Sequence, residues 1–241
     1  MNNNKMGDIK LSIYAISDLH LALGTNKPMD IFGESWNNHL TKIELDWKSK
    51  AKVDDVILLP GDLSWAMNIK ETYLDFKYLN NLPGKKILLK GNHDYWWTTV
   101  TSMKRYMLEN KFENINFLYN NSYQYEDYII CGTRGWNNTE STEDEKIYKR
   151  EQQRLKLSIE DGIRKYGRER KIIVCMHYPP FNKIQCEEGF IKIMKQYNVA
   201  QCVYGHLHGS SQNEAKEGNI DGIDFKLVSC DYTDFKLIKL Q

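Results

Sequence analysis

Short apolar runs alternate along the chain with segments in which apolar residues recur at helical spacing. The runs at 11–16, 53–59, 87–89, 115–118, 128–131, 171–176 and 201–204 predict strands. The periodic segments at 37–51, 98–110 and 190–197 predict helices. Alternation of this kind is typical of an α/β fold. We found no repeats or linkers, so we expect a single domain over residues 1–241.

Three further segments lead to more specific expectations. Asn68 is expected to cap a helix that carries Tyr73, Phe76 and Leu79. The charged segment 136–166 predicts a loop followed by one long surface helix, around 140–167, that forms a rim or cap over a cleft. The runs 223–228 and 235–240 are interpreted as a closing pair of antiparallel strands.

Polar residues follow five of the predicted strands. Ligands of α/β sheets bind beyond the carboxyl ends of the strands, so these residues can converge at one edge. Five of the six histidines lie at such positions, and His39 is interpreted as an ordinary surface or capping residue. The polar clusters are Asp18 with His20, Gly61 with Asp62, the run Gly91-Asn92-His93-Asp94, His177, and His206 with His208.

The residue types in these clusters indicate a metal site. Imidazole, carboxylate and amide oxygen suit first-row ions such as Mn, Fe or Zn. The ligands are too many for one tetrahedral zinc, which indicates two ions with Asp62 as the bridging carboxylate. Two divalent ions facing Asp18 and Asp62 leave a charge of about +2, which would hold a phosphate and deprotonate a water. His93, oriented by Asp94, is then expected to donate a proton to the leaving group.

Taken together and in order, these clusters resemble the calcineurin-like metallophosphoesterase superfamily. The resemblance extends from residue 18 to residue 208. It implies a four-layer sandwich of two mixed β-sheets packed face to face and flanked by helices. It also implies one metal on Asp18, His20, Asp62 and His208, and a second on Asp62, Asn92, His177 and His206. His93 would contact the phosphate, and Asp94 would orient His93.

One motif departs from the family pattern. Many members continue the Gly-Asp motif with another Asp and often an Arg, whereas this chain continues with Leu63-Ser64-Trp65. The phosphate-binding arginines of protein phosphatases therefore have no clear counterpart. Arg134, after a predicted strand, is a candidate for binding substrate phosphate, although a surface arginine in a turn is the commoner case.

Two other groups near the motifs carry side chains with possible functional roles. The aromatic residues 95–97 could stack on a base or aryl group, but packing under the following helix is the favoured interpretation. Ser64 lacks the Gly-x-Ser-x-Gly context of a nucleophile, so no catalytic role is assigned to it.

Composition narrows the possible partners. The 241 residues carry a net charge of +1, and 27% are charged, so no global field recruits nucleic acid or anionic membranes. We therefore expect a small phosphorylated substrate. The five cysteines are an odd number without a Cys-x-x-Cys pair, which favours a reducing compartment. There is no apolar run of spanning length and no secretion signal, so the expected location is cytoplasmic.

The leading hypothesis is a dinuclear-metal phosphoesterase that uses metal-bound hydroxide to hydrolyse a phosphomonoester or a phosphodiester. One alternative is a catalytically silent metal-binding interaction module on the same fold. A nuclease is a third possibility, disfavoured by the near-neutral charge and the absence of a basic tract.

Overall fold

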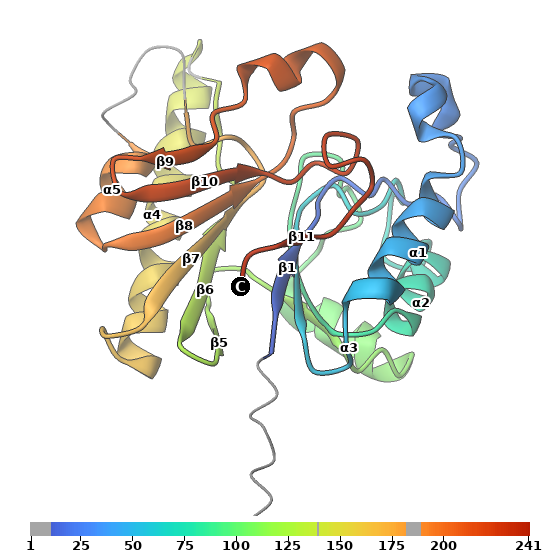
Figure 1. Cartoon of the computed structure of the whole chain (residues 1–241), viewed down its shortest axis with the longest axis horizontal. Helices are drawn as coiled ribbons and strands as arrows, with labels where there is room; N and C mark the ends of the chain where they lie inside the picture. Colours follow the sequence, from blue (N-terminus) through green and yellow to red (C-terminus); the bar gives the residue numbers. More distant parts are fainter. Residues whose placement is uncertain (1–10, 139, 182–188) are drawn as a thin grey trace, which may run out of the picture.

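Two mixed β-sheets form the centre of the molecule (Figure 1). The computed structural model describes residues 11–138, 140–181 and 189–241. In the five-stranded sheet, four strands are parallel and the edge strand β11 is antiparallel to β1. The strand order is β11 (Ile238–Lys239), β1 (Ile13–Ala15), β2 (Val56–Pro60), β3 (Lys85–Leu89) and β4 (Ile115–Phe117).

The second sheet has six strands. Its four central strands are parallel, and an antiparallel strand closes each edge. The order is β5 (Tyr123–Tyr125), β6 (Tyr128–Thr133), β7 (Lys171–Met176), β8 (Val199–Tyr204), β10 (Ile223–Leu227) and β9 (Gly218–Ile220).

Helices cover the outer face of each sheet (Figure 1). The five-stranded sheet carries α1 (His39–Lys50), α2 (Tyr73–Asn81) and α3 (Val100–Glu109). The six-stranded sheet carries α4 (Thr142–Tyr166) and α5 (Phe190–Gln196). Three short 3₁₀ turns, η1 (Asp30–Phe32), η2 (Glu34–Trp36) and η3 (Gly209–Glu214), lie in loops.

Alternate residues of each strand pack into different cores. In β2, Val56 and Leu58 join the apolar cluster between the sheets, whereas Ile57 and Leu59 join the cluster under α1 to α3. Strands buried on both faces need apolar residues at every position, which explains the continuous apolar runs of the sequence. The expected four-layer sandwich is therefore confirmed: two mixed sheets, face to face, between two layers of helices.

The last two predicted strands do not pair with each other. β10 lies parallel to β8 and antiparallel to β9, and β11 pairs with β1 in the other sheet. The chain crosses between the sheets at residues 228–235, where Cys230 N donates to Ser17 O and Phe235 is buried beneath α1. The predicted antiparallel pair is wrong because each strand has a better partner in a different sheet.

Two smaller expectations also need correction. Asn68 does not cap α2, which begins at Tyr73; its Oδ1 accepts from the N–H groups of Lys70 and Glu71 in the preceding turn, at 3.1 and 3.3 Å. His39 is half-buried, with Nδ1 3.2 Å from Trp36 O and its ring packed against Phe235. It is therefore a packing residue at the first position of α1.

Four of the five cysteines lie within the described residues. Cys131, Cys175, Cys202 and Cys230 are buried free thiols, and Cys186 lies outside the described residues. Among the described helices, none combines the length and the apolar composition needed to cross a membrane.

Candidate metal centre

The polar strand ends of both sheets meet at one place. Asp18 and His20 follow β1, Asp62 follows β2, and Asn92 and His93 follow β3. From the other sheet, His177 follows β7, and His206 and His208 follow β8. The two sheets are joined here by a parallel bridge between Ser17 and Ser229. The structure thus brings together residues that are up to 190 positions apart in sequence.

The turns that carry these residues have an uncommon backbone conformation. Asp18, His20, Asp62 and His206 have positive φ values of 60°, 46°, 51° and 73°. Non-glycine residues adopt this left-handed region rarely, and such conformations cluster at functional sites where the surrounding structure enforces them. The strand ends here are therefore shaped to aim side chains inward.

Two motif glycines allow close approach of the turns. A Cβ on Gly91 would collide with the Asp62 carboxylate, and a Cβ on Gly205 would collide with the Asp18 carboxylate. Each glycine lies directly before a candidate ligand, Asn92 or His206. Glycine is required at these positions because a neighbouring carboxylate occupies the space of its side chain.

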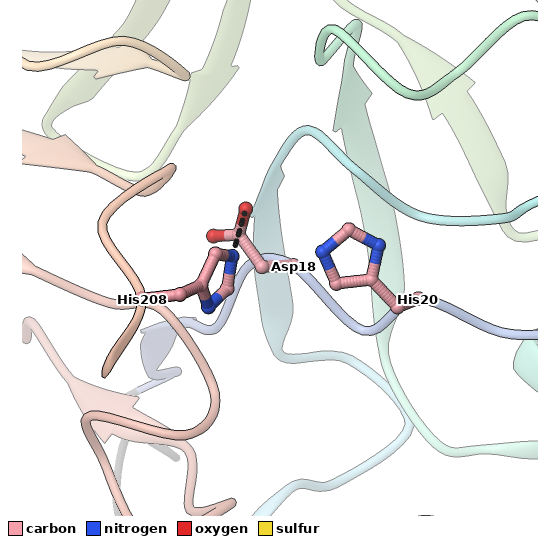
Figure 2. Close-up of side chains that lie close together, drawn as sticks. All are labelled: Asp18, His20 and His208. Carbon is pink, nitrogen blue, oxygen red and sulfur yellow. Dashed lines mark ion pairs between the residues drawn. The ribbon is translucent and has the colours of Figure 1, made fainter. Parts of the chain in front are cut away.

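Asp18, His20 and His208 form one potential metal-binding group (Figure 2). Each offers a ligand atom, and these atoms lie within 4.8 Å of one another. His208 Nε2 is 3.3 Å from Asp18 Oδ1, and its Nδ1 is 2.8 Å from Asp231 Oδ1. A carboxylate behind a ligating imidazole fixes its orientation, as is usual in metal sites.

A second group gathers around Asn92. Its Oδ1 is 2.7 Å from His177 Nε2 and 3.0 Å from His206 Nδ1. His177 is fully buried, and its Nδ1 lies 3.0 Å from Pro60 O, which leaves Nε2 directed into the site. One amide oxygen and two imidazole nitrogens therefore converge from both sheets.

Asp62 lies between the two groups. Its Oδ2 is 3.6 Å from His177 Nε2 and 3.9 Å from His20 Nε2, while its Oδ1 accepts from His93 N at 2.8 Å. The ligand atoms of Asp18, Asp62 and His177 also lie within 4.8 Å of one another. A carboxylate in this position is placed to face both groups at once.

The protonation states suit metal binding. Burial lowers the pKa of His20 and His177 to about 3 and that of His206 to about 4, so these rings are neutral donors at pH 7. His20 Nδ1 and His208 Nε2 are buried without a hydrogen-bond partner among the described residues. Neutral imidazoles, carboxylates and an amide oxygen fit a pair of first-row ions such as Mn, Fe or Zn.

His208 and Asp62 hold protons that a metal must displace. Burial lowers the pKa of His208, but the Asp18 and Asp231 carboxylates, 3.3 and 2.8 Å from its two ring nitrogens, outweigh burial and raise the pKa to about 10. Burial and the charges of Asp18 and Asp94 raise the pKa of Asp62 to about 9. At pH 7 both groups are protonated in the metal-free site, and a ligand must lose its proton to bind metal.

We therefore expect Mn²⁺ affinity to rise with pH. Between pH 7 and 9 the dissociation constant should fall by roughly tenfold per pH unit for each proton displaced. Calorimetric Mn²⁺ titrations at pH 7, 8 and 9 measure this slope. In Asp231→Asn, which removes one charge that holds the His208 proton, the slope should be shallower. A dissociation constant independent of pH would contradict the assignment.

Asp94 does not orient His93 in the way the sequence suggested. The fully buried Asp94 carboxylate accepts from Gly91 N at 2.7 Å and, across the site, from Asp62 N at 3.0 Å. Leu63 N and Trp96 Nε1 donate to it at 2.9 and 3.0 Å. Its oxygens thus fasten the turn after β2 to the turn after β3. Among the described residues, the His93 Nδ1 has no hydrogen-bond partner, so the expected direct pair is wrong.

Asp94→Asn should therefore destabilise the fold. The substitution turns one acceptor oxygen into an NH₂ group that faces N–H donors, so we expect a loss of about 3 kcal/mol in the free energy of unfolding. Urea unfolding of metal-free protein measures it. The control is Asp221→Asn, which breaks only the exposed ion pair with Lys195 and should cost less than about 1 kcal/mol. Equal stability of the two variants would refute the role given to Asp94.

His93 lies at the open side of the site. Its Nε2 is 4.0 Å from Asp62 Oδ2, and its ring centroid is 4.5 Å from that of Trp65. Lys27 Nζ lies 3.1 Å above the Trp65 ring. Burial and the Lys27 charge hold the pKa of His93 below its ordinary value. Trp65, in the motif that lacks the further Asp of many family members, thus packs beside the imidazole.

Comparison with known proteins agrees with this geometry. The model of the calcineurin-like phosphoesterase family matches residues 11–210. The chain belongs to this family. No curated protein sequence matches the chain.

Solved structures of low sequence identity share the fold of this calcineurin-like chain. Phosphopantetheinyl hydrolase (PptH) from Mycobacterium tuberculosis aligns with a TM-score of 0.53 at 15% identity, covering 96% of both chains. TT1561 of Thermus thermophilus aligns with a TM-score of 0.56 at 16% identity, covering 95% of this chain and 98% of its own. Together, the family and the candidate metal groups support a phosphoesterase-type function.

Sequence reasoning missed two contributors to this calcineurin-like site. Asp231 holds His208, and Ser229 Oγ donates to Asp18 Oδ2 at 3.1 Å. Both follow β10, so the segment 228–231 is a sixth polar strand end beside the five that were found. This segment carries no histidine, so it lacks the residue type that distinguished most of the other strand ends.

The remaining candidates have clear placements. Arg134 follows β6, and its guanidinium carbon lies 4.9 Å from the Trp136 ring centroid and 6.0 Å from that of Tyr178. Trp96 is buried, and Trp97 packs against Phe117. Trp96 and Trp97 therefore have the packing role that the sequence analysis favoured, whereas Tyr95 is exposed near His93. Ser64 Oγ is buried and donates to Asp75, consistent with a structural residue.

Proposed function

We propose that this chain is a dinuclear metal-dependent phosphoesterase that hydrolyses a phosphomonoester or a phosphodiester. The observation that carries the proposal is the position of Asp62. Its Oδ2 lies 3.6 to 4.0 Å from the Nε2 atoms of three imidazoles: His177, His20 and His93. A single carboxylate therefore faces both ligand groups and the imidazole at the open side.

In this proposal each ligand group holds one ion. The first is bound by Asp18, His20, Asp62 and His208, and the second by Asp62, Asn92, His177 and His206. Two such ions supply Lewis-acid polarisation of the phosphoryl oxygens and lower the pKa of water. Their charge also provides the local attraction for phosphate that a chain of net charge +1 lacks as a whole.

The protein groups orient the ligands and handle the leaving oxygen. Asp231 fixes the His208 ring, and Pro60 O fixes His177 through its Nδ1. His93 is partly exposed beside Asp62, so its Nε2 can donate a hydrogen bond to a phosphoryl or leaving oxygen of a bound ester. Asp94 keeps the two turns that carry Asp62 and His93 in register.

Purified protein supplied with Mn²⁺ should hydrolyse p-nitrophenyl phosphate, bis-p-nitrophenyl phosphate or both. The activity should disappear with EDTA and return with added metal. If protein that contains two metal ions turned over neither ester, nor any phosphorylated compound in a broad substrate panel, the proposal would fail. The chain would then be better described as a catalytically silent metal-binding module.

A further inference from the structure

A basic cavity lies beside the metal centre. Its volume is about 820 Å³, and its walls come from the ends of β3, β4 and β6, the start of α3, and α4. Cavities of this size typically hold small molecules. Five cationic side chains line it, namely Lys90, Lys104, Arg134, Arg150 and Arg154.

A single carboxylate, Glu151, lies among these cations. It is fully buried, accepts from Thr133 Oγ1 at 2.6 Å and from Arg154 Nη1 at 2.6 Å, and lies 3.8 Å from Arg150 Nε. Arg154 Nη2 also donates to Tyr119 OH at 2.9 Å. Glu151 therefore neutralises one charge and ties two arginines to the cavity wall.

The other three cations have no such partner. Among the described residues, Lys90, Lys104 and Arg134 form no ion pair with a carboxylate, and Arg134 Nε is buried without a hydrogen-bond partner. Five positive charges and one negative charge leave a surplus of about +4 in one cavity. On a chain of net charge +1, this is a local concentration and not a general property of the surface.

The cavity adjoins the metal centre through two of its residues. Lys90 lies two positions before Asn92 in the turn after β3. Arg134 O accepts from the backbone N–H groups of His177 and Tyr178 at 3.2 and 2.9 Å. The Tyr178 ring in turn lies 4.3 Å from the His206 ring, between centroids. The cavity therefore borders the strand ends that carry Asn92 and His177.

We propose that this cavity is an anion subsite that binds a further phosphate of a small polyphosphorylated substrate while the ester to be cleaved lies at the metal centre. The inference rests on the proposed phosphoesterase function. Lysine and arginine side chains around a cavity suit a phosphate or polyphosphate group, since arginine binds phosphate with paired hydrogen bonds.

Binding of inorganic tripolyphosphate tests the subsite without the metals. Calorimetry on EDTA-treated full-length protein compares the parent with the double variant Lys104→Gln/Arg150→Gln. The matched control is Arg105→Gln/Lys146→Gln, which removes two neighbouring charges from the same helices, α3 and α4, outside the cavity lining. We expect the dissociation constant to rise by about tenfold or more in the double variant and to stay unchanged in the control.

Catalysis gives a second readout. With Mn²⁺ present, kcat/KM is measured for a nucleoside 3′,5′-bisphosphate and for the matching 5′-monophosphate. The ratio of the two values should exceed one in the parent. It should fall by about tenfold in the double variant, because the extra phosphate loses two of its charge partners. The control should keep the parent ratio.

The outcomes separate this inference from the proposed function. Tripolyphosphate binding that depends on Lys104 and Arg150, without turnover of any ester, would support the subsite and count against the phosphoesterase. Metal-dependent turnover with the same tripolyphosphate affinity in parent and double variant would overturn the subsite. Affinity for single-stranded oligonucleotides that keeps rising with length would overturn the assignment to a small substrate and favour nucleic acid.

Discussion

Asp62→Asn should lower kcat/KM by about 10³-fold or more and reduce the bound metal to half of the parent content or less. The carboxylate faces both ligand groups, with Oδ2 3.6 Å from His177 Nε2 and 3.9 Å from His20 Nε2. Removing its charge should cost several kcal/mol of charge stabilisation, and each 1.36 kcal/mol corresponds to about a tenfold change in rate. Metal analysis of the purified variant and steady-state kinetics with Mn²⁺ measure both effects.

Asparagine is a suitable replacement because the backbone can keep its shape. Asp62 has a φ of 51°, a region that Asn and Asp adopt more readily than other residues. The amide oxygen can still accept from His93 N, which now donates to Asp62 Oδ1 at 2.8 Å. Asp231→Asn is the milder comparison, because Asp231 contacts the ligand His208 and is not itself a ligand. Its metal affinity should fall by about 10- to 100-fold. Full metal content and activity in Asp62→Asn would exclude a bridging role.

His93→Gln should lower kcat by about 10²- to 10⁴-fold, the usual range for a group that transfers or donates a proton in the transition state. Metal content should remain equal to that of the parent, because His93 belongs to neither ligand group. KM should change little if the ring acts on the leaving oxygen and not on ground-state binding. Stopped assays with Mn²⁺-loaded protein and metal analysis of the same sample measure these quantities.

Tyr95→Phe is the matched control for His93→Gln. Tyr95 is exposed, and its ring lies 6.2 Å from that of His93, so it shares the neighbourhood without facing Asp62. Its kcat should stay within about twofold of the parent, as expected for a surface substitution. If both variants lost activity equally, the effect would belong to the loop as a whole and the role of His93 would be wrong.

The apolar runs predicted an α/β fold because the strands are buried on both faces, and the resemblance to the calcineurin-like superfamily supplied the expectation of two sheets packed face to face. Continuous apolar runs such as 56–59 can be recognised without knowing their partners, since every position must be apolar. The polar residues after those runs could likewise be assigned to one edge, because parallel strands end together. This reasoning accounts for Asp18, Asp62 and Asn92, which follow strands of one sheet, whereas the position of His177 depends on how the second sheet packs against the first.

Long-range pairing was not visible in the sequence. The short strand β11 pairs with β1, more than 200 residues away, and its two residues give no pattern that names a partner. The role of Asp94 was missed for a similar reason. Adjacency to His93 suggested a pair, but the buried carboxylate is saturated by N–H groups from the turn after β2, which only the folded chain brings close.

The candidate metal ligands come from both sheets, and this affects how firmly the two sheets are held together. Asp18, Asp62 and Asn92 belong to one sheet, and His177, His206 and His208 to the other. An ion held by both sets acts as a reversible cross-link that closes a long stretch of chain, and anything that binds only the folded form stabilises it by mass action. Removal of the metal by a chelator should therefore weaken the packing between the two sheets before either sheet unfolds. The linking segment 228–235 should then become accessible to proteases.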